Sequence, residues 1–243
     1  MVTWSLPVTR GRFDFERHRI VMPSVSVSGV TKIYPGEEPV LALDGVSFDV
    51  GAGEMVALMG PSGCGKSSLL NLIGCVDLPT LGTITLAGRV TAGLPERDLT
   101  LLRRDRVGTI FQNFNLLPAL RVEENVALPL VLQKRPRLEI VARVAAALEA
   151  VGLSSKARAY PAHLSGGQAQ RAAVARALIH GPAVILADEP TGSLDSKTAE
   201  TVLELLRTAA SNGPAVLLAT HSAKAASFCD RVLAMSDGRL LDG

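Results

Sequence analysis

Residues 60–67 read Gly-Pro-Ser-Gly-Cys-Gly-Lys-Ser, which has the residue types and the spacing of a phosphate-binding loop. A continuous apolar run at residues 55–59 precedes it, and residues 68–76 can continue as a helix. Backbone N–H groups of such a loop turn inward around phosphate oxygens, and the positive end of the helix faces the same oxygens. We therefore predict that the chain binds a nucleoside triphosphate.

Two side chains of this loop have separate expected roles. Lys66 is placed to neutralise the β and γ phosphates, and the hydroxyl of Ser67 is placed to ligate Mg²⁺. The residues predicted to contact the nucleotide here are Gly60, Pro61, Ser62, Gly63, Cys64, Gly65, Lys66, Ser67 and Ser68.

Residues 184–187 form an apolar strand that ends in two carboxylates, Asp188 and Glu189. In a phosphate-loop protein such a strand can deliver an acid to the metal, so Asp188 is the predicted Mg²⁺ partner. Glu189 is the candidate that takes a proton from the attacking water. Alone, the pattern would be an ordinary strand exit, and the phosphate loop upstream is what favours the catalytic interpretation.

A second glycine-rich segment, residues 164–168, opens a helix and is here called the Ser-Gly-Gly segment. Its hydroxyl and two glycines leave backbone N–H groups free at a positive helix end, which could grip another phosphate. By itself, a Ser-Gly-Gly pattern at the start of a helix is usually only a cap, so the isolated signal is weak. Its members are Leu164, Ser165, Gly166, Gly167 and Gln168.

The order of expected elements predicts an α/β fold. Alternating residues and turns in the range 25–50 indicate antiparallel strands, and expected strands follow at 83–87 and 107–112. From residue 166 onward, strands and helices alternate (166–180, 183–187, 196–210, 215–220), which predicts a parallel sheet covered by helices. Ligands of such sheets lie beyond the carboxyl ends of the strands.

Between these parts we expect an inserted helical subdomain, at about residues 113–165. Ile140, Val144, Leu148 and Val151 share one face of a helix over residues 139–151, and Gly152 ends it. The predicted architecture is therefore a phosphate-loop NTPase core with a parallel sheet, an antiparallel β subdomain and this insertion, together spanning residues 23–243.

Hydropathy argues against a membrane-embedded chain. The mean hydropathy is +0.28, but no apolar stretch approaches the roughly 18 residues that a spanning helix needs. The first twenty residues lack the apolar centre of a secretory signal, so we expect residence in the cytosol. Cys64, Cys75 and Cys229 show no metal-ligand spacing and are predicted to be reduced thiols.

Residues 1–22 form a basic extension that we predict to be disordered. Four arginines and two acids within residues 1–21 account for the whole net charge of +2, so the body is neutral and we predict no nucleic-acid partner. The arm could contact anionic lipid, or it could be a simple tail, or translation could begin at Met22.

Six motifs in order and register resemble those of the ATPase subunits of ABC transporters, over about residues 25–240. They are the phosphate loop, Gln112, residues 164–168, residues 184–189, Ser193-Leu194-Asp195 and His221. The resemblance implies a homodimer in which two copies meet head to tail. Each ATP would then lie between the phosphate loop of one copy and the Ser-Gly-Gly segment of the other.

The resemblance assigns expected roles to four further residues. Tyr34 resembles the aromatic that stacks on adenine, a contact of about 1–3 kcal/mol by analogy with base stacking, and would otherwise be a strand-end tyrosine. Gln112 resembles the glutamine that contacts Mg²⁺ and water, and His221 the histidine that holds the γ-phosphate. Asp195 resembles an acid of the loop that crosses the dimer, and it could also cap the helix that follows.

A narrower similarity, carried by residues 108–118 and 123–130, is to the LolD/MacB branch of lipoprotein release and macrolide export. It implies an integral membrane permease partner of the FtsX type and a peripheral place on the cytoplasmic face of the cell membrane. Arg121, Ala169 and Ser193 depart from that branch, outside the catalytic set.

Two other functions are alternatives. An importer's ATPase would differ mainly in residues 112–130. A soluble ABC protein acting on DNA or ribosomes is disfavoured, because the chain carries one phosphate loop, a neutral body and no room for a long coiled coil between Gln112 and Leu164.

Overall fold

The computed structural model describes residues 23–241. The basic extension at residues 1–22 lies outside this range, so its disorder and the alternatives to it stay predictions. The helices are α1 (Lys66–Ile73), α2 (Glu96–Arg106), α3 (Val122–Leu132), α4 (Arg137–Ala150), α5 (Gly166–Leu178), α6 (Ser196–Ser211) and α7 (Ala223–Ala226). The strands are β1 (Val25–Tyr34), β2 (Val40–Val50), β3 (Met55–Met59), β4 (Leu81–Leu86), β5 (Arg89–Val90), β6 (Val107–Phe111), β7 (Val184–Asp188), β8 (Ala215–Thr220), β9 (Arg231–Ser236) and β10 (Arg239–Leu240).

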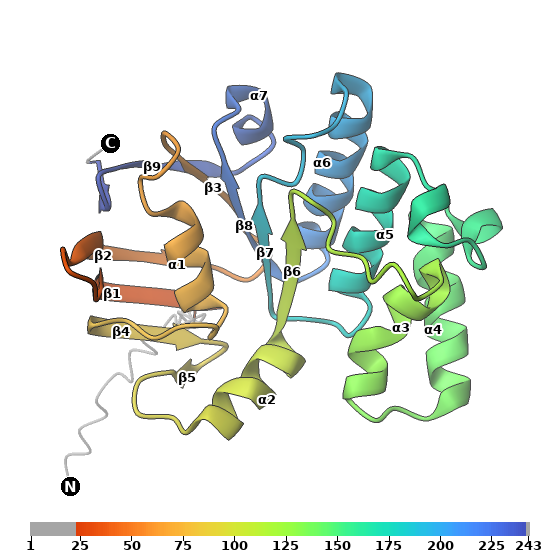
Figure 1. Ribbon diagram of the computed structural model, residues 1–243, viewed down its shortest axis with the longest axis horizontal. Coiled ribbons are helices and arrows are strands. Elements are labelled where there is room, and N and C mark those ends of the chain that lie inside the picture. Colours follow the sequence, from red (N-terminus) through yellow and green to blue (C-terminus); the bar gives the residue numbers. More distant parts are fainter. Residues whose placement is uncertain (1–22, 242–243) are drawn as a thin grey trace, which may run out of the picture.

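Two sheets form the framework, as Figure 1 shows. One is antiparallel, with strand order β2-β1-β4-β5. The other has the order β10-β9-β3-β8-β7-β6, and its strands from β9 to β6 are all parallel. The predicted combination of a parallel core and an antiparallel N-terminal sheet is confirmed.

The central strands are buried on both faces, and alternate residues enter different cores. On β7, Val184 and Leu186 belong to the core that contains α1 and the antiparallel sheet. Ile185 and Ala187 belong to the core that contains α5 and α6. Strands covered on both sides need apolar residues at every position, which explains their continuous apolar sequences.

The parallel register brings several chain segments to one edge of the sheet. Phe111 at the end of β6 pairs with Asp188 at the end of β7, and Asp188 pairs in turn with Ala219 of β8. Met59, the last residue of β3, pairs with Thr220. The phosphate loop, Gln112, Glu189 and His221 therefore leave the sheet side by side.

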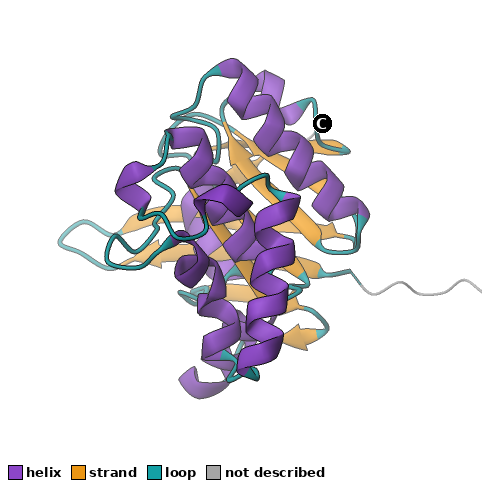
Figure 2. Ribbon diagram, turned by 90° about the vertical axis from the view of Figure 1, so that its right-hand side faces the viewer, coloured by secondary structure: helices purple, strands orange, loops and turns teal. Residues whose placement is uncertain are grey.

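Helices α3 and α4, here called the helical lobe, lie within the range predicted for the inserted subdomain, whose boundaries remain a prediction. Their core includes Val126 and Leu130 of α3 and Val144 and Leu148 of α4. Helix α5 contributes to this core through Ala172, Ala175 and Ile179. Figure 2 views the molecule from this side, with these helices in front of the strands.

The structure differs from the sequence prediction in several elements. Helix α1 begins at Lys66 rather than at residue 68 and ends at Ile73, because Gly74 forms its C-cap and Cys75 has a φ of 56°. Helix α2 was not predicted, since only its Leu99 and Leu102 are buried. The strands β5, β9 and β10 were also missed. Among the described helices, none has the length and apolar character that crossing a bilayer requires.

Asn125 is a buried polar residue that holds the chain entering the helical lobe. Its Oδ1 accepts a hydrogen bond from the N–H of Leu117 at 2.7 Å, and its Nδ2 donates to the carbonyl oxygens of Leu117, Leu120 and Arg121 at 3.0–3.1 Å. Residues 112–118, here called the Gln112 loop, are thereby fixed at their C-terminal end.

We predict that Asn125→Leu lowers the free energy of unfolding by about 2–3 kcal/mol, because it leaves several backbone groups without partners. Urea denaturation followed by circular dichroism measures this. The control is Asn71→Leu, at an exposed position on α1, which should change stability by less than about 0.5 kcal/mol. Equal effects of the two substitutions would contradict the role given to Asn125.

Candidate active site

The phosphate loop turns into α1 at Gly65. This residue has a φ of +104°, and a Cβ there would overlap the carbonyl oxygen of Ala42, so only glycine fits. The ammonium of Lys66 donates to the carbonyl oxygens of Gly60 at 2.7 Å and Pro61 at 2.8 Å. Lys66 thus lies inside the loop that its neighbours form, and its charge faces the loop interior.

Beside the loop, the Ser67 hydroxyl donates to Oδ2 of Asp188 at 2.7 Å. Both line a cavity of about 280 Å³. The cavity is completed by Phe111, Gln112, Asn113, Asn115 and Glu189. The structure therefore brings together the three residues predicted for Mg²⁺, Ser67, Gln112 and Asp188, and the predicted general base.

Glu189 is held in an uncommon conformation. Its φ is +46°, a left-handed value that costs a non-glycine residue about 1–2 kcal/mol. Nδ1 of His221 lies 2.8 Å from its Oε1, and the hydroxyl of the buried Thr220 donates to its Oε2 at 3.4 Å. The turn aims the carboxylate over the sheet edge, where Thr220 at the end of β8 and His221 directly after it hold the carboxylate. The sequence analysis did not single out Thr220.

A second cavity, of about 450 Å³, adjoins the first and extends from the phosphate loop to the antiparallel sheet. It is lined by Tyr34, Val40, Leu41, Ala42, Ser62, Gly63, Gly65, Lys66, Ser67, Ser68, Asp188 and Glu189. The ammonium of Lys32 lies 4.9 Å from the centroid of the Tyr34 ring. Tyr34 of the antiparallel sheet thus lines the same cavity as the phosphate loop and the two carboxylates.

The Ser-Gly-Gly segment lies apart from these cavities, neither of which it lines. Ser165 and Gln168 form a reciprocal cap of α5, in which the Gln168 N–H donates to the Ser165 hydroxyl and the Ser165 N–H donates to the Gln168 side chain. A Cβ at Gly167 would overlap the methyl group of Thr198, so α5 begins in close contact with α6. Figure 1 shows α1 and α5 on either side of strands β6–β8.

Asp195 caps α6 and likewise lines neither cavity. Its carboxylate accepts hydrogen bonds from the N–H of Thr198 at 3.0 Å and from the Thr198 hydroxyl at 2.6 Å. These hydrogen bonds hold the pKa of the Asp195 carboxyl below its ordinary value. The capping role considered for this residue is present in the structure.

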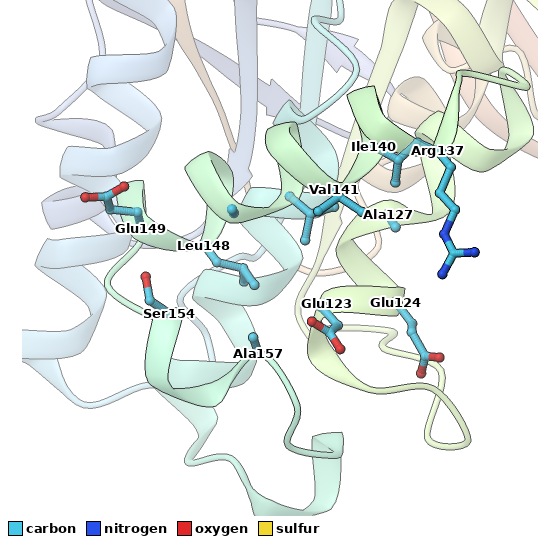
Figure 3. A pocket seen from close by; sticks show the side chains of 12 residues that line it. Glu123, Glu124, Ala127, Arg137, Ile140, Val141, Leu148, Glu149, Ser154 and Ala157 are labelled. Atoms are coloured by element: carbon cyan, nitrogen blue, oxygen red, sulfur yellow. The ribbon is translucent and has the colours of Figure 1, made fainter.

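A further cavity, of about 570 Å³, lies in the helical lobe and not at the phosphate loop. Figure 3 shows its lining side chains, which come from α3, α4, the 3₁₀ turn Ser154–Lys156 and Ala157 directly after it. Apolar side chains such as Val141 and Leu148 line it, together with carboxylates of Glu123 and Glu124. It contains none of the residues that the sequence assigns to nucleotide binding.

Comparison with known proteins decides the family. A family model described as ABC transporter matches residues 43–192. The chain belongs to this family. It is 43% identical, over 89% of its own length and 94% of the relative, to the uncharacterized ABC transporter ATP-binding protein MJ0796 of Methanocaldococcus jannaschii. The predicted relationship to ABC ATPase subunits is confirmed, and the chain is an ATP-binding and ATP-hydrolysing subunit of this class.

Two other comparisons extend this result. The chain is 44% identical over 220 residues to the macrolide export ATP-binding/permease protein MacB of Burkholderia pseudomallei, but it spans only 34% of that protein. A dimeric structure of MJ0796 in a post-hydrolysis state with ADP and Pi superimposes with a TM-score of 0.83, at 42% identity, covering 90% of this chain and 97% of that one. The predicted similarity to the LolD/MacB branch is confirmed.

The cysteines give a prediction about thiol reactivity. Burial raises the pKa of Cys75 to about 11 and that of Cys229 to about 12. Because the thiolate is the nucleophile, both should react with Ellman's reagent at pH 8 at least about 100-fold more slowly than the same thiols in 6 M urea. Measuring the rates in Cys64→Ala removes the phosphate-loop thiol from the signal. Rapid reaction of either thiol in the folded protein would show that its site is open to solvent.

Proposed function

We propose that two copies of this chain sandwich two ATP molecules and drive a membrane permease of the FtsX type from the cytoplasmic face of the membrane. The observation that carries the proposal is the edge of the parallel sheet where the phosphate loop, Asp188, Glu189 and Gln112 line adjoining cavities. The named relatives support it, since one is an ATP-binding/permease protein and another forms a dimer with ADP and Pi.

The geometry supports one orientation of ATP. Phosphates fit the end of the 450 Å³ cavity at Lys66, and the base fits the end at Tyr34. Lys32 occupies one face of the Tyr34 ring, which leaves the other face to stack on adenine. When phosphates enter, the Lys66 ammonium exchanges its contacts with the carbonyls of Gly60 and Pro61 for charged oxygens, which are stronger acceptors.

The residues beside the loop fit Mg²⁺. The hydroxyl of Ser67 and the carboxylate of Asp188 already lie 2.7 Å apart, and both are oxygen ligands. Within residues 23–241 no cluster of three or more histidines, cysteines or acids could enclose a metal alone. Mg²⁺ suits such a site, because it takes one or two protein ligands and completes its shell with phosphates and water. When bound, it would neutralise charge on the transferred phosphoryl group.

Hydrolysis is an in-line attack of water on the γ-phosphate, with Glu189 accepting the proton from that water. His221 and Thr220 hold the Glu189 carboxylate in place for this step. Lys66 and the N–H groups of the loop stabilise negative charge as the bond to the leaving ADP breaks. In the closed dimer, His221 would contact the γ-phosphate, for which its 69% exposed side chain is available.

The Ser-Gly-Gly segment completes the site of the partner copy. It lines neither cavity of its own chain, and its capped, glycine-rich helix end presents N–H groups at an exposed position. A second copy facing head to tail would place this end against the γ-phosphate held by the first. Asp195 would then lie in the segment that crosses the dimer.

The permease partner fits the surface beside α3. A groove of about 390 Å³ lies between α2 and α3. Leu128, Pro129 and Leu132 supply an apolar wall, and Arg103 and Arg104 supply charge. An amphipathic segment of a membrane subunit would match this composition, so closure of the dimer would be transmitted there.

We predict that Glu189→Gln lowers ATP turnover by about 100- to 10,000-fold while ATP binding is retained, because only the proton acceptor is lost. Phosphate release measures turnover, and size-exclusion chromatography with ATP measures the dimer, which should accumulate. The control is Glu200→Gln on α6, whose half-exposed carboxylate pairs with Lys224 and lines neither cavity, so turnover should stay within about twofold of wild type. Normal turnover in Glu189→Gln would remove Glu189 from its role.

A second prediction tests the shared site. Lys66→Ala and Ser165→Ala should each abolish turnover when present in both copies. Mixing them creates dimers in which one site carries both defects and the other carries none, so turnover should recover to about a quarter of wild type with random pairing. Recovery is measured by phosphate release after co-expression of differently tagged copies. A mixture no more active than its parents would contradict the head-to-tail arrangement.

A further inference from the structure

Two polar side chains of α5, beyond the Ser-Gly-Gly segment, contact the backbone near Glu189 and Gln112. The first is Gln170, whose side chain is fully buried. Its Nε2 donates to the carbonyl oxygen of Pro190 at 2.6 Å and lies 3.4 Å from that of Phe111. Pro190 directly follows Glu189, and Phe111 directly precedes Gln112. One amide therefore contacts the backbone beside both residues.

The environment of Gln170 is unfavourable for stability alone. Its Oε1 is buried and has no hydrogen-bond partner within residues 23–241. An unsatisfied buried acceptor destabilises a folded protein, and an apolar replacement would in turn leave the carbonyl oxygen of Pro190 without its donor. The hydrogen bonds of this amide are therefore those of its Nε2, beside the catalytic residues.

The second side chain is Arg176, two turns further along α5. Its Nη1 donates to the carbonyl oxygen of Asn115 at 2.5 Å and its Nη2 to that of Phe114 at 2.9 Å. Phe114 and Asn115 both have positive φ values, of 60° and 46°. Two consecutive left-handed residues are unfavourable, so this bend of the Gln112 loop needs an external partner. The planar guanidinium supplies two parallel donors at the spacing of the two carbonyls.

Arg176 lacks the partner that a partly buried cation usually has. No carboxylate of the described residues forms an ion pair with it. Burial accordingly lowers the pKa of its guanidinium. Its hydrogen bonds go to the two loop carbonyls, so its charge serves the conformation of the loop.

We propose that Gln170 and Arg176 are positioning residues that hold Gln112 in its place in the active site from both ends of its backbone. This inference rests on the proposed function, because α5 also begins with the segment that would contact the partner's ATP. The same helix then connects that contact to Gln112 of its own chain. Neither side chain lines the cavity beside Asp188, so neither is a catalytic residue.

The expected consequence is a loss of turnover rather than of ATP binding. Without Arg176 the two left-handed residues can relax, and Gln112 moves with them. A misplacement of about 1 Å lowers rates by up to about 100-fold. The phosphate loop and Tyr34 lie elsewhere and keep their geometry, so the affinity for ATP should change little.

The test compares Arg176→Leu with Arg171→Leu. Arg171 lies on the same helix and also donates to a backbone carbonyl, that of Val151 at 2.7 Å, which belongs to the end of α4 and not to the Gln112 loop. We expect Arg176→Leu to lower kcat by 10- to 100-fold, with the Kd for the fluorescent analogue TNP-ATP within about twofold of wild type. Arg171→Leu should keep kcat within about twofold, and unfolding midpoints of both variants show how much stability each has lost.

Two more variants separate positioning from general loss of structure. Arg176→Lys should give an intermediate kcat, because an ammonium reaches one carbonyl but does not span both. Gln170→Met should lower kcat without changing the Kd for TNP-ATP. Equal losses of kcat in Arg176→Leu and Arg171→Leu, or wild-type kcat in Arg176→Leu, would overturn the inference. So would Arg176→Lys being no more active than Arg176→Leu.

The failure of this inference is distinguishable from failure of the proposed function. If Glu189→Gln stops turnover and accumulates dimer while Arg176→Leu turns over normally, the proposed function stands and the positioning role falls. If Glu189→Gln turns over normally, the assignment of the site itself is wrong, whatever Arg176 does.

Discussion

The parallel pairing of β3, β6, β7 and β8 is the constraint on which the site depends. Backbone hydrogen bonds fix Phe111, Asp188 and Ala219 in one row, so the residues that follow these strands emerge together. A shift of one residue in any pair would move a carboxylate to the opposite face of the sheet. The apolar cores on both faces prevent such shifts, because every side chain of β7 before Asp188 is buried. The packing of the two cores therefore fixes the relative positions of the catalytic residues.

Helix α5 has an unusual position in this arrangement, since its residues enter two cores. Val174 and Ala177 pack against the parallel sheet, while Ala172 and Ala175 pack against the helical lobe. Small side chains allow close approach on both sides, and a Cβ at Gly108 of β6 would overlap the backbone of Ala177. Helix α5 therefore packs between the parallel sheet and the helical lobe and contributes to both cores. Two of its polar side chains, Gln170 and Arg176, donate to backbone carbonyls at the Gln112 loop and beside Glu189.

The sequence predicted the elements that a short motif or a regular apolar pattern specifies. The phosphate loop is specified by its glycines and Lys66, and the buried strands by uninterrupted apolar runs such as residues 215–219. Helix α2 was missed because most of its surface is polar, and β9 because only one of its six residues is buried. The positions of α2 and β9 depend on tertiary contacts, which a short sequence pattern does not reveal. The caps made by Ser165 and Asp195 were anticipated from residue type alone.

Other features of the site have no signal in the sequence. The left-handed turn at Glu189 can be predicted only when the pairing of β7 with β8 is known. The role of Thr220 depends on the same pairing. Gln170 and Arg176 sit in an alanine-rich helix, where a polar residue is a common solvated position. Only the structure shows that Gln170 is buried and that Arg176 reaches the carbonyls of Phe114 and Asn115.

The ammonium of Lys66, bonded to two carbonyls of its own loop, also has a consequence for ligand discrimination. An incoming molecule competes with neutral oxygens that are already well oriented, so it must offer acceptors of greater strength. Sugars and amides present no such advantage, whereas a chain of linked anionic groups presents several at once. The loop therefore selects ligands by their density of negative charge as well as by their shape. The same two hydrogen bonds of Lys66 also stabilise the conformation of the loop itself.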